Sequence, residues 1–68
     1  MEIIINNQPK QIHSASLTVQ QLLDLEIPEK QKGVAVAINN TVVPKAEWTR
    51  HGIVDKDNIL IIKATQGG

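Results

Sequence analysis

The chain has 68 residues, no cysteine, and seven basic side chains that balance seven acidic ones. This length predicts one small domain, and the absence of thiols excludes disulfides, iron–sulfur clusters and thiolate zinc sites. The zero net charge argues against a general nucleic-acid-binding protein. The start of the chain lacks the basic residues and the long apolar run of a signal peptide or membrane span. We therefore expect a cytoplasmic protein with no membrane segment.

The first two strands are predicted to form a hairpin. Residues 1–6 include three consecutive Ile side chains, which are β-branched, and the run breaks at residues 6–9. Residues 10–13 then form the return strand. Pro9 has no N–H to donate, so we expect it at the turn or on an edge strand.

A helix is predicted to follow this hairpin. Thr18 is a good N-cap, Gln21 completes a capping box three residues later, and Leu17 can pack onto Leu22. Pro28 ends the helix, because the residue before a proline is biased toward extended geometry. The predicted apolar stripe consists of Val19, Leu22 and Leu23.

A second hairpin is predicted after the helix. Residues 34–38 alternate large side chains with Ala, which is typical of a strand with one bulky and one nearly flat face. Residues 39–40 are both Asn and suit a two-residue turn, because Asn tolerates positive φ. Residues 41–43 form the partner strand, which Pro44 ends.

The last part of the chain predicts a buried Trp and a final strand. Residues 45–50 can form one helical turn that lays Trp48, the only aromatic residue, against the core. Asp55 and Asp57 are predicted as turn residues that bond their own backbone. Residues 59–62 are apolar on both faces, as is typical of a strand in the middle of a sheet or under a partner.

The order of the elements is strand, strand, helix, strand, strand, strand, and one helix can cover only one face of one sheet. The first and last strands are the most apolar, so we place them side by side and parallel at the centre. The predicted fold class is therefore α+β: a β-grasp with a mixed sheet of four to five strands and one main helix across one face. Residues 1–64 form this domain, and residues 65–68 form a flexible C-terminal tail.

The tail ends in two glycines, Gly67 and Gly68. Without side chains, both fit a slot too narrow for other residues. The terminal carboxylate is ionised at neutral pH and is a poor electrophile until it is activated, for example as an acyl-adenylate. On the two glycines alone, a frayed chain end is the better explanation, so the rest of the chain has to decide.

No catalytic or metal site is predicted. His13 and His51 are far apart in sequence and have no Cys or third His beside them. The acidic residues around the end of the helix are expected to form a solvated face, and no glycine-rich loop could cradle a phosphate. The residues excluded in this way are Asp24, Glu26, Glu29, Gly33 and Gly52.

Five segments together carry a family pattern: residues 18–23, 36–39, 43–48 and 55–59, and the final Gly67-Gly68. Through them, nearly the whole chain resembles the sulfur carrier proteins of thiamine biosynthesis, the ThiS family. Two turn positions depart from the usual pattern. Lys56 stands where the family often has Gly between two Asp, and Asn7 stands where it often has Gly after Asn.

The resemblance implies a ubiquitin-like fold and a reaction cycle on Gly68. An adenylyltransferase related to ubiquitin-activating enzymes uses ATP to adenylate the Gly68 carboxylate, and Gly67 and Gln66 give the tail access to that enzyme. Sulfur from a donor such as a cysteine desulfurase displaces AMP and leaves a thiocarboxylate, which thiazole synthase receives. The chain itself binds no cofactor and is not an enzyme.

A docking face is also predicted, because one helix leaves apolar residues uncovered. If Ile59 and Ile61 point to the helix, their neighbours in the strand point away from it. We expect the free protein to be a soluble monomer. Small soluble monomers seldom expose a contiguous apolar patch without a binding role. The alternative is ordinary scattered exposure. The predicted docking residues are Ile4, Ala37, Leu60 and Ile62, with Ala35 beside them.

Three other functions stay open at this point. The small subunit of molybdopterin synthase uses the same Gly-Gly thiocarboxylate. A ubiquitin-type modifier would end in an isopeptide bond from Gly68 to a lysine. A ubiquitin-like binding module with an inert tail would belong to a different class, and it alone would tolerate a C-terminal tag.

Overall fold

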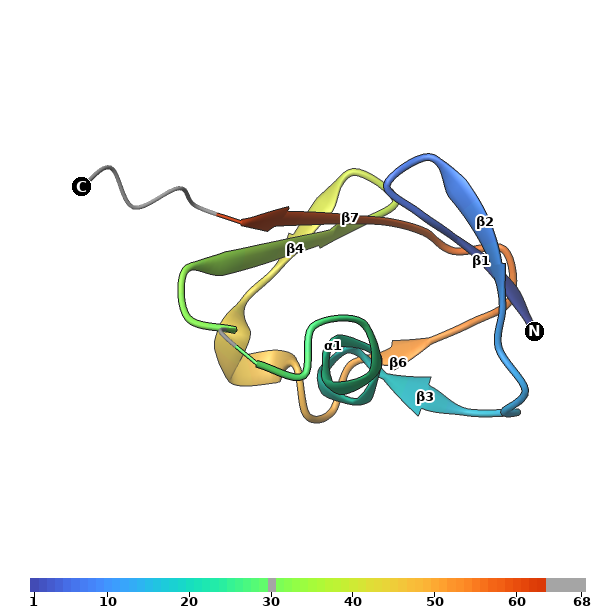
Figure 1. Cartoon of the computed structure of the whole chain (residues 1–68), viewed down its shortest axis with the longest axis horizontal. Coiled ribbons are helices and arrows are strands. Elements are labelled where there is room, and N and C mark those ends of the chain that lie inside the picture. Colours follow the sequence, from blue (N-terminus) through green and yellow to red (C-terminus); the bar gives the residue numbers. More distant parts are fainter. Residues whose placement is uncertain (30, 64–68) are drawn as a thin grey trace.

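The computed structural model describes residues 1–29 and 31–63. The sequence predictions for the tail, including those for Gln66, Gly67 and Gly68, lie outside these residues. In chain order, the elements are β1 (Glu2–Ile5), β2 (Gln8–Gln11), β3 (Leu17–Thr18), α1 (Val19–Glu26), β4 (Val34–Ile38), β5 (Thr41–Val43), the 3-10 helix η1 (Lys45–Glu47), β6 (Gly52–Ile53) and β7 (Asn58–Lys63) (Figure 1).

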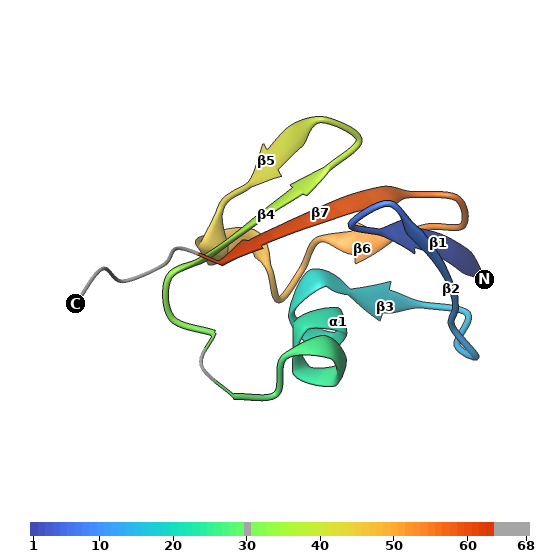
Figure 2. The same cartoon turned by 45° about the horizontal axis from the view of Figure 1, so that its top comes forward.

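The main sheet has five strands in the order β2-β1-β7-β4-β5, and α1 lies on one side of it (Figure 2). β1 and β7 are parallel neighbours, while the other pairs in this sheet are antiparallel. The first and last strands therefore lie side by side near the centre, and the predicted β-grasp arrangement is confirmed. A second pairing, between β3 and β6, joins Leu17 to Ile53 and Thr18 to Gly52. The sequence analysis did not predict this two-stranded sheet.

In the main sheet, an Asn-Asn turn connects the two strands of each hairpin. Asn39 and Asn40 have φ values of 50° and 71°, so the predicted turn is confirmed. Asn6 and Asn7 have φ values of 49° and 68° and close an equally short loop. The return strand therefore begins at Gln8, and the prediction that it spans residues 10–13 is wrong at both ends. Pro9 lies within this strand, at the edge of the sheet, where its missing N–H disturbs no ladder.

The start of α1 has the predicted capping box. The Thr18 hydroxyl accepts a hydrogen bond from the Gln21 backbone N–H at 3.2 Å, and the Gln21 side chain accepts one from the Thr18 N–H at 2.9 Å. The helix ends at Glu26, two residues before Pro28, as expected. Its buried side chains are those of the predicted stripe, Val19, Leu22 and Leu23.

We expect Thr18→Ala to lower the free energy of unfolding by about 1 kcal/mol, because the Gln21 N–H loses its acceptor. Urea denaturation monitored by Trp48 fluorescence measures this change. Thr49→Ala is the matched control, because Thr49 is exposed and its hydroxyl has no hydrogen bond within the described residues. A loss no larger than that of the control would contradict the capping role.

Trp48 is the largest side chain of the core. It is 1% exposed, and its indole N–H donates to the Val43 carbonyl oxygen at 3.0 Å. The predicted core role of Trp48 is therefore confirmed. The other buried core side chains are Ile3, Ile5, Ile12, Leu17, Val19, Leu22, Leu23, Val36, Ile38, Val43, Ile53 and Ile59.

Candidate functional site

The face of the main sheet that points away from α1 is apolar and open. Along β7, Ile59 is fully buried, whereas Leu60 is 45% and Ile62 is 51% exposed. This alternation is that of a strand whose successive side chains point to opposite faces. The predicted directions of these side chains are therefore confirmed, while their role in docking stays a prediction.

Neighbouring strands widen this surface. The register places Ala37 between Leu60 of β7 and Val42 of β5, and places Ala35 opposite Ile62. The small side chain of Ala37 lies in a hollow between these larger neighbours. The hollow is lined by Ala37, Val42, Leu60 and Ile62 together with Asn7, Asn40 and Asn58. We call Ala35, Ala37, Val42, Leu60 and Ile62 the open face.

The residues of this surface differ from the predicted docking residues at two positions. Ile4 is half-buried and lies opposite Asn58 in the β1–β7 register, but it does not line the hollow. Val42 was not predicted as a docking residue, yet its side chain is 69% exposed. The signal was present in the sequence, because a two-residue turn at residues 39–40 pairs Val42 with Ala37 and so puts both on one face.

The start of β7 is fixed by a buried carboxylate. Asp57 is 7% exposed and accepts hydrogen bonds from the Asn39 side chain at 3.0 Å and from the Val54 N–H at 2.9 Å. The Val54 contact is the predicted bond within the turn. Asp55 differs from the prediction, because its carboxylate accepts from the N–H of Glu2, at 2.7 Å, and so ties the turn to β1.

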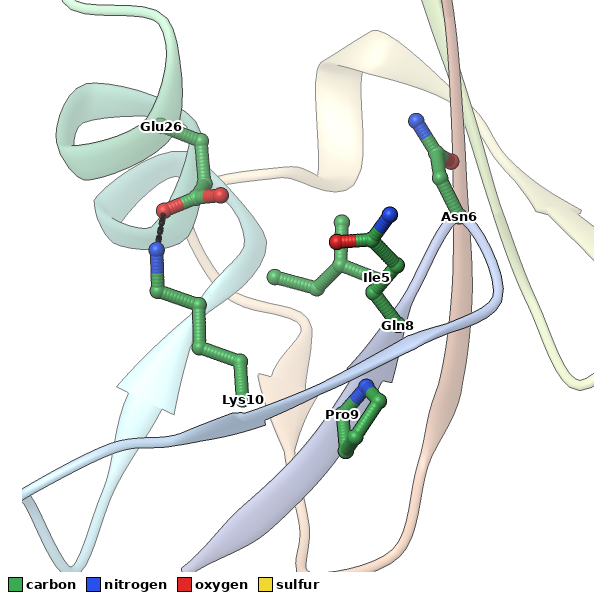
Figure 3. A pocket seen from close by; sticks show the side chains of 6 residues that line it. All are labelled: Ile5, Asn6, Gln8, Pro9, Lys10 and Glu26. Atoms are coloured by element: carbon green, nitrogen blue, oxygen red, sulfur yellow. Dashed lines mark hydrogen bonds and ion pairs between the residues drawn. The ribbon is translucent and has the colours of Figure 1, made fainter.

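The polar residues around the end of α1 are paired. Gln31 and Gln20 both donate to the Asp24 carboxylate, at 2.9 Å and 3.0 Å, and these bonds lower its pKa. Figure 3 shows Lys10 of β2 reaching the Glu26 carboxylate beside a polar hollow. Asp24 and Glu29 are exposed, as the predicted solvated face requires, whereas Glu26 is half-buried and paired with Lys10.

The described residues contain no group of three His, Asp or Glu side chains that could hold a metal ion. His13 is exposed on the segment after β2, and His51 is half-buried beside β6. No helix within residues 1–29 and 31–63 is long and apolar enough to cross a membrane.

The sequence model of the ThiS family matches residues 3–68. The chain belongs to the ThiS family. A curated relative, the "Sulfur carrier protein ThiS" of Escherichia coli (strain K12), is 38% identical over 68 residues, and the match covers all of both chains. The family membership predicted from the sequence is therefore confirmed.

Solved structures of a ThiS protein share this fold. A crystal structure of the thiamine biosynthesis protein (ThiS) from Geobacter metallireducens is 23% identical, with a TM-score of 0.87 and full coverage of both chains. A solution structure of a thiamine biosynthesis protein from the same organism is 25% identical, with a TM-score of 0.82 over all of this chain and 88% of that chain. The fold of the chain is therefore that of ThiS.

Both positions at which this ThiS sequence departs from the usual pattern have left-handed backbone. The φ values are 68° at Asn7 and 73° at Lys56. Glycine adopts this region without steric cost, whereas Lys does not. The strained residue, Lys56, makes two contacts with Glu2. Its backbone N–H donates to the Glu2 carbonyl oxygen at 2.6 Å, and its ammonium group lies 2.9 Å from the Glu2 carboxylate. The carboxylate raises the pKa of Lys56.

Proposed function

We propose that this protein is a sulfur carrier of thiamine biosynthesis, with Gly68 as the residue that carries the sulfur. The observation that supports this most directly is the family match, which spans nearly the whole chain and runs through residue 68. The Escherichia coli relative, which is matched over all of both chains, is itself a sulfur carrier protein. The chemistry needs only a terminal carboxylate and a tail that another enzyme can admit, and Gln66, Gly67 and Gly68 provide both.

The proposed cycle activates the carboxylate before sulfur arrives. A carboxylate oxygen of Gly68 attacks the α-phosphorus of ATP, pyrophosphate leaves, and an acyl-adenylate forms. A persulfide from the donor attacks the acyl carbon and AMP leaves. A thiol then reduces the resulting acyl disulfide, which releases the thiocarboxylate for thiazole formation.

The catalytic groups for these steps are supplied by partner proteins in this proposal. The partners are an adenylyltransferase related to ubiquitin-activating enzymes, which uses the ATP, a sulfur donor such as a cysteine desulfurase, and thiazole synthase. The chain acts as their co-substrate, binds no cofactor, is a monomer when free, and works in the cytoplasm, where ATP is available. Its open face supplies apolar surface for docking.

The test is the mass of the intact protein after incubation with the adenylyltransferase, ATP and a sulfur donor. We expect the chain to gain the mass difference between sulfur and oxygen, and fragmentation should place the change at Gly68. A conjugate with a lysine of another protein would instead indicate a ubiquitin-type modifier. Sulfur delivered to a molybdopterin precursor, and not to a thiazole, would indicate a molybdopterin synthase subunit, and an unchanged mass would favour a binding module.

A further inference from the structure

β7 extends beyond the strand that flanks it on one side. β1 pairs with β7 through Ile4–Asn58 and Ile5–Ile59, and at Asn6 the main chain turns away into β2. On the other side, β4 pairs with β7 from Ile59 to Lys63. The last part of β7, Ile61 to Lys63, therefore has a strand neighbour on only one side within the described residues. It is also the part of β7 that leads toward the tail.

The Asn6 side chain occupies the place that β1 leaves. The Ile61 N–H donates to the Asn6 side-chain oxygen at 2.8 Å, and the Asn6 amide NH2 donates to the Ile61 carbonyl at 3.3 Å. The Asn6 backbone N–H donates to the Ile59 carbonyl at 2.9 Å. A carboxamide has the same donor and acceptor as a peptide group. The side chain thus continues the ladder by one step, although the main chain has already left the strand.

The second Asn-Asn turn shows the same division of roles. The Asn39 N–H donates to the Asn58 carbonyl at 2.8 Å, and the Asn58 N–H donates to the Asn39 side chain at 3.0 Å. The second residues of the two turns, Asn7 and Asn40, make no side-chain hydrogen bond to the described residues. All four residues have positive φ, but within the described residues only the first of each pair forms hydrogen bonds with β7. Turn formation alone therefore does not account for Asn6.

We propose that Asn6 is a positioning residue for the chemistry at Gly68, because it supports β7 at Ile61 on the side that β1 has left. This role rests on the proposed sulfur-carrier function. Lys63 precedes the reacting glycine by five residues. Misplacement of a reacting group by about 1 Å can cost a hundredfold in rate, so we expect the position of the strand from which the tail starts to affect the chemical step. Leu60 is paired to Ala37 of β4, and this contact does not depend on Asn6.

The role predicts a specific kinetic pattern. Without the Asn6 amide, Ile61 loses its support on the β1 side, while Leu60 and Ile62 of the open face stay paired to Ala37 and Ala35 of β4. We therefore expect kcat for adenylation to fall by about fivefold, the effect of losing roughly one hydrogen bond, and KM to change by less than about twofold. A purely structural defect would lower the folded fraction and would leave no such split in fully folded protein.

The test compares Asn6→Gly with Asn7→Gly. Glycine accepts positive φ at either position, so both variants keep the turn, but only Asn6→Gly removes the contacts with Ile61. Hydrogen exchange of the isolated protein and adenylation kinetics are measured for both. We expect the Ile61 amide to exchange about fivefold faster in Asn6→Gly and at the parental rate in Asn7→Gly. Asn6→Asp keeps the acceptor for the Ile61 N–H and should recover part of the protection and part of kcat.

The outcomes separate this role from the proposed function. If the parent chain is adenylated and Asn6→Gly has the same kcat, the positioning role is overturned and the sulfur-carrier function stands. Equal losses in Asn6→Gly and Asn7→Gly would also overturn it, because the turn would then be the cause. A parent chain that is never adenylated by a competent enzyme overturns both, and parental exchange of the Ile61 amide in Asn6→Gly overturns the contact on which the role depends.

Discussion

Gly67→Val is expected to fold as the parent chain does and to fail to acquire sulfur. In the proposed cycle, the Gly68 carboxylate has to reach the α-phosphate of ATP inside the adenylyltransferase, and we expect the opening to fit only a chain without side chains. A branched side chain at position 67 would collide with the walls of that opening and restrict φ and ψ where the tail enters. The measurement is intact mass after incubation with the adenylyltransferase, ATP and a sulfur donor.

A residue appended after Gly68 should abolish loading for a different reason. The new carboxylate would lie roughly 3.5 Å further along the chain, which is far more than the reaction tolerates. Gly52→Ala is the control for Gly67→Val, because it adds a Cβ to a glycine of β6 at a place where no atom beyond the chain neighbours lies within 4 Å of the added carbon. We expect this control to be loaded like the parent. Sulfur acquired at the parental rate by the extended or Gly67→Val chain would exclude the tail as the site.

Leu60→Asp should weaken binding to the adenylyltransferase by about tenfold or more and leave the fold largely intact. Leu60 is 45% exposed at the middle of the open face, so a carboxylate there stays in water in the free protein. In the complex, the same carboxylate would lose water without gaining a partner. Central apolar residues of an interface commonly contribute more than 1 kcal/mol, which corresponds to roughly this loss of affinity.

Leu25→Asp is the matched control for this experiment. Leu25 is 64% exposed on α1, on the opposite side of the sheet from the open face. Calorimetric titration should give the parental affinity for this variant and a weaker one for Leu60→Asp. Equal affinities for the two variants would show that the open face does not dock the enzyme, and unfolding of Leu60→Asp would show that the residue supports the core.

Some features of this protein could be derived from the sequence because their causes are local. The capping box needs only the spacing between Thr18 and Gln21, and the turn at residues 39–40 needs only two residues that tolerate positive φ. The directions of the side chains in β7 follow from the two-residue period of a strand. The order of the elements and the family pattern also follow from local signals. From these two, the β-grasp fold and membership of the ThiS family were predicted.

Other features depended on contacts between residues far apart in the chain. Asp55 binds the backbone of Glu2 across 53 residues, and Asn6 binds Ile61 across 55. The β3–β6 pairing and the full extent of the open face likewise require that separate segments meet. Hydrophobic periodicity records which face of a segment is buried, but it carries no information about which distant backbone group a polar side chain will meet. Only the packed structure brings the Asn6 amide to β7, because the parallel pairing of β1 with β7 ends one residue before it.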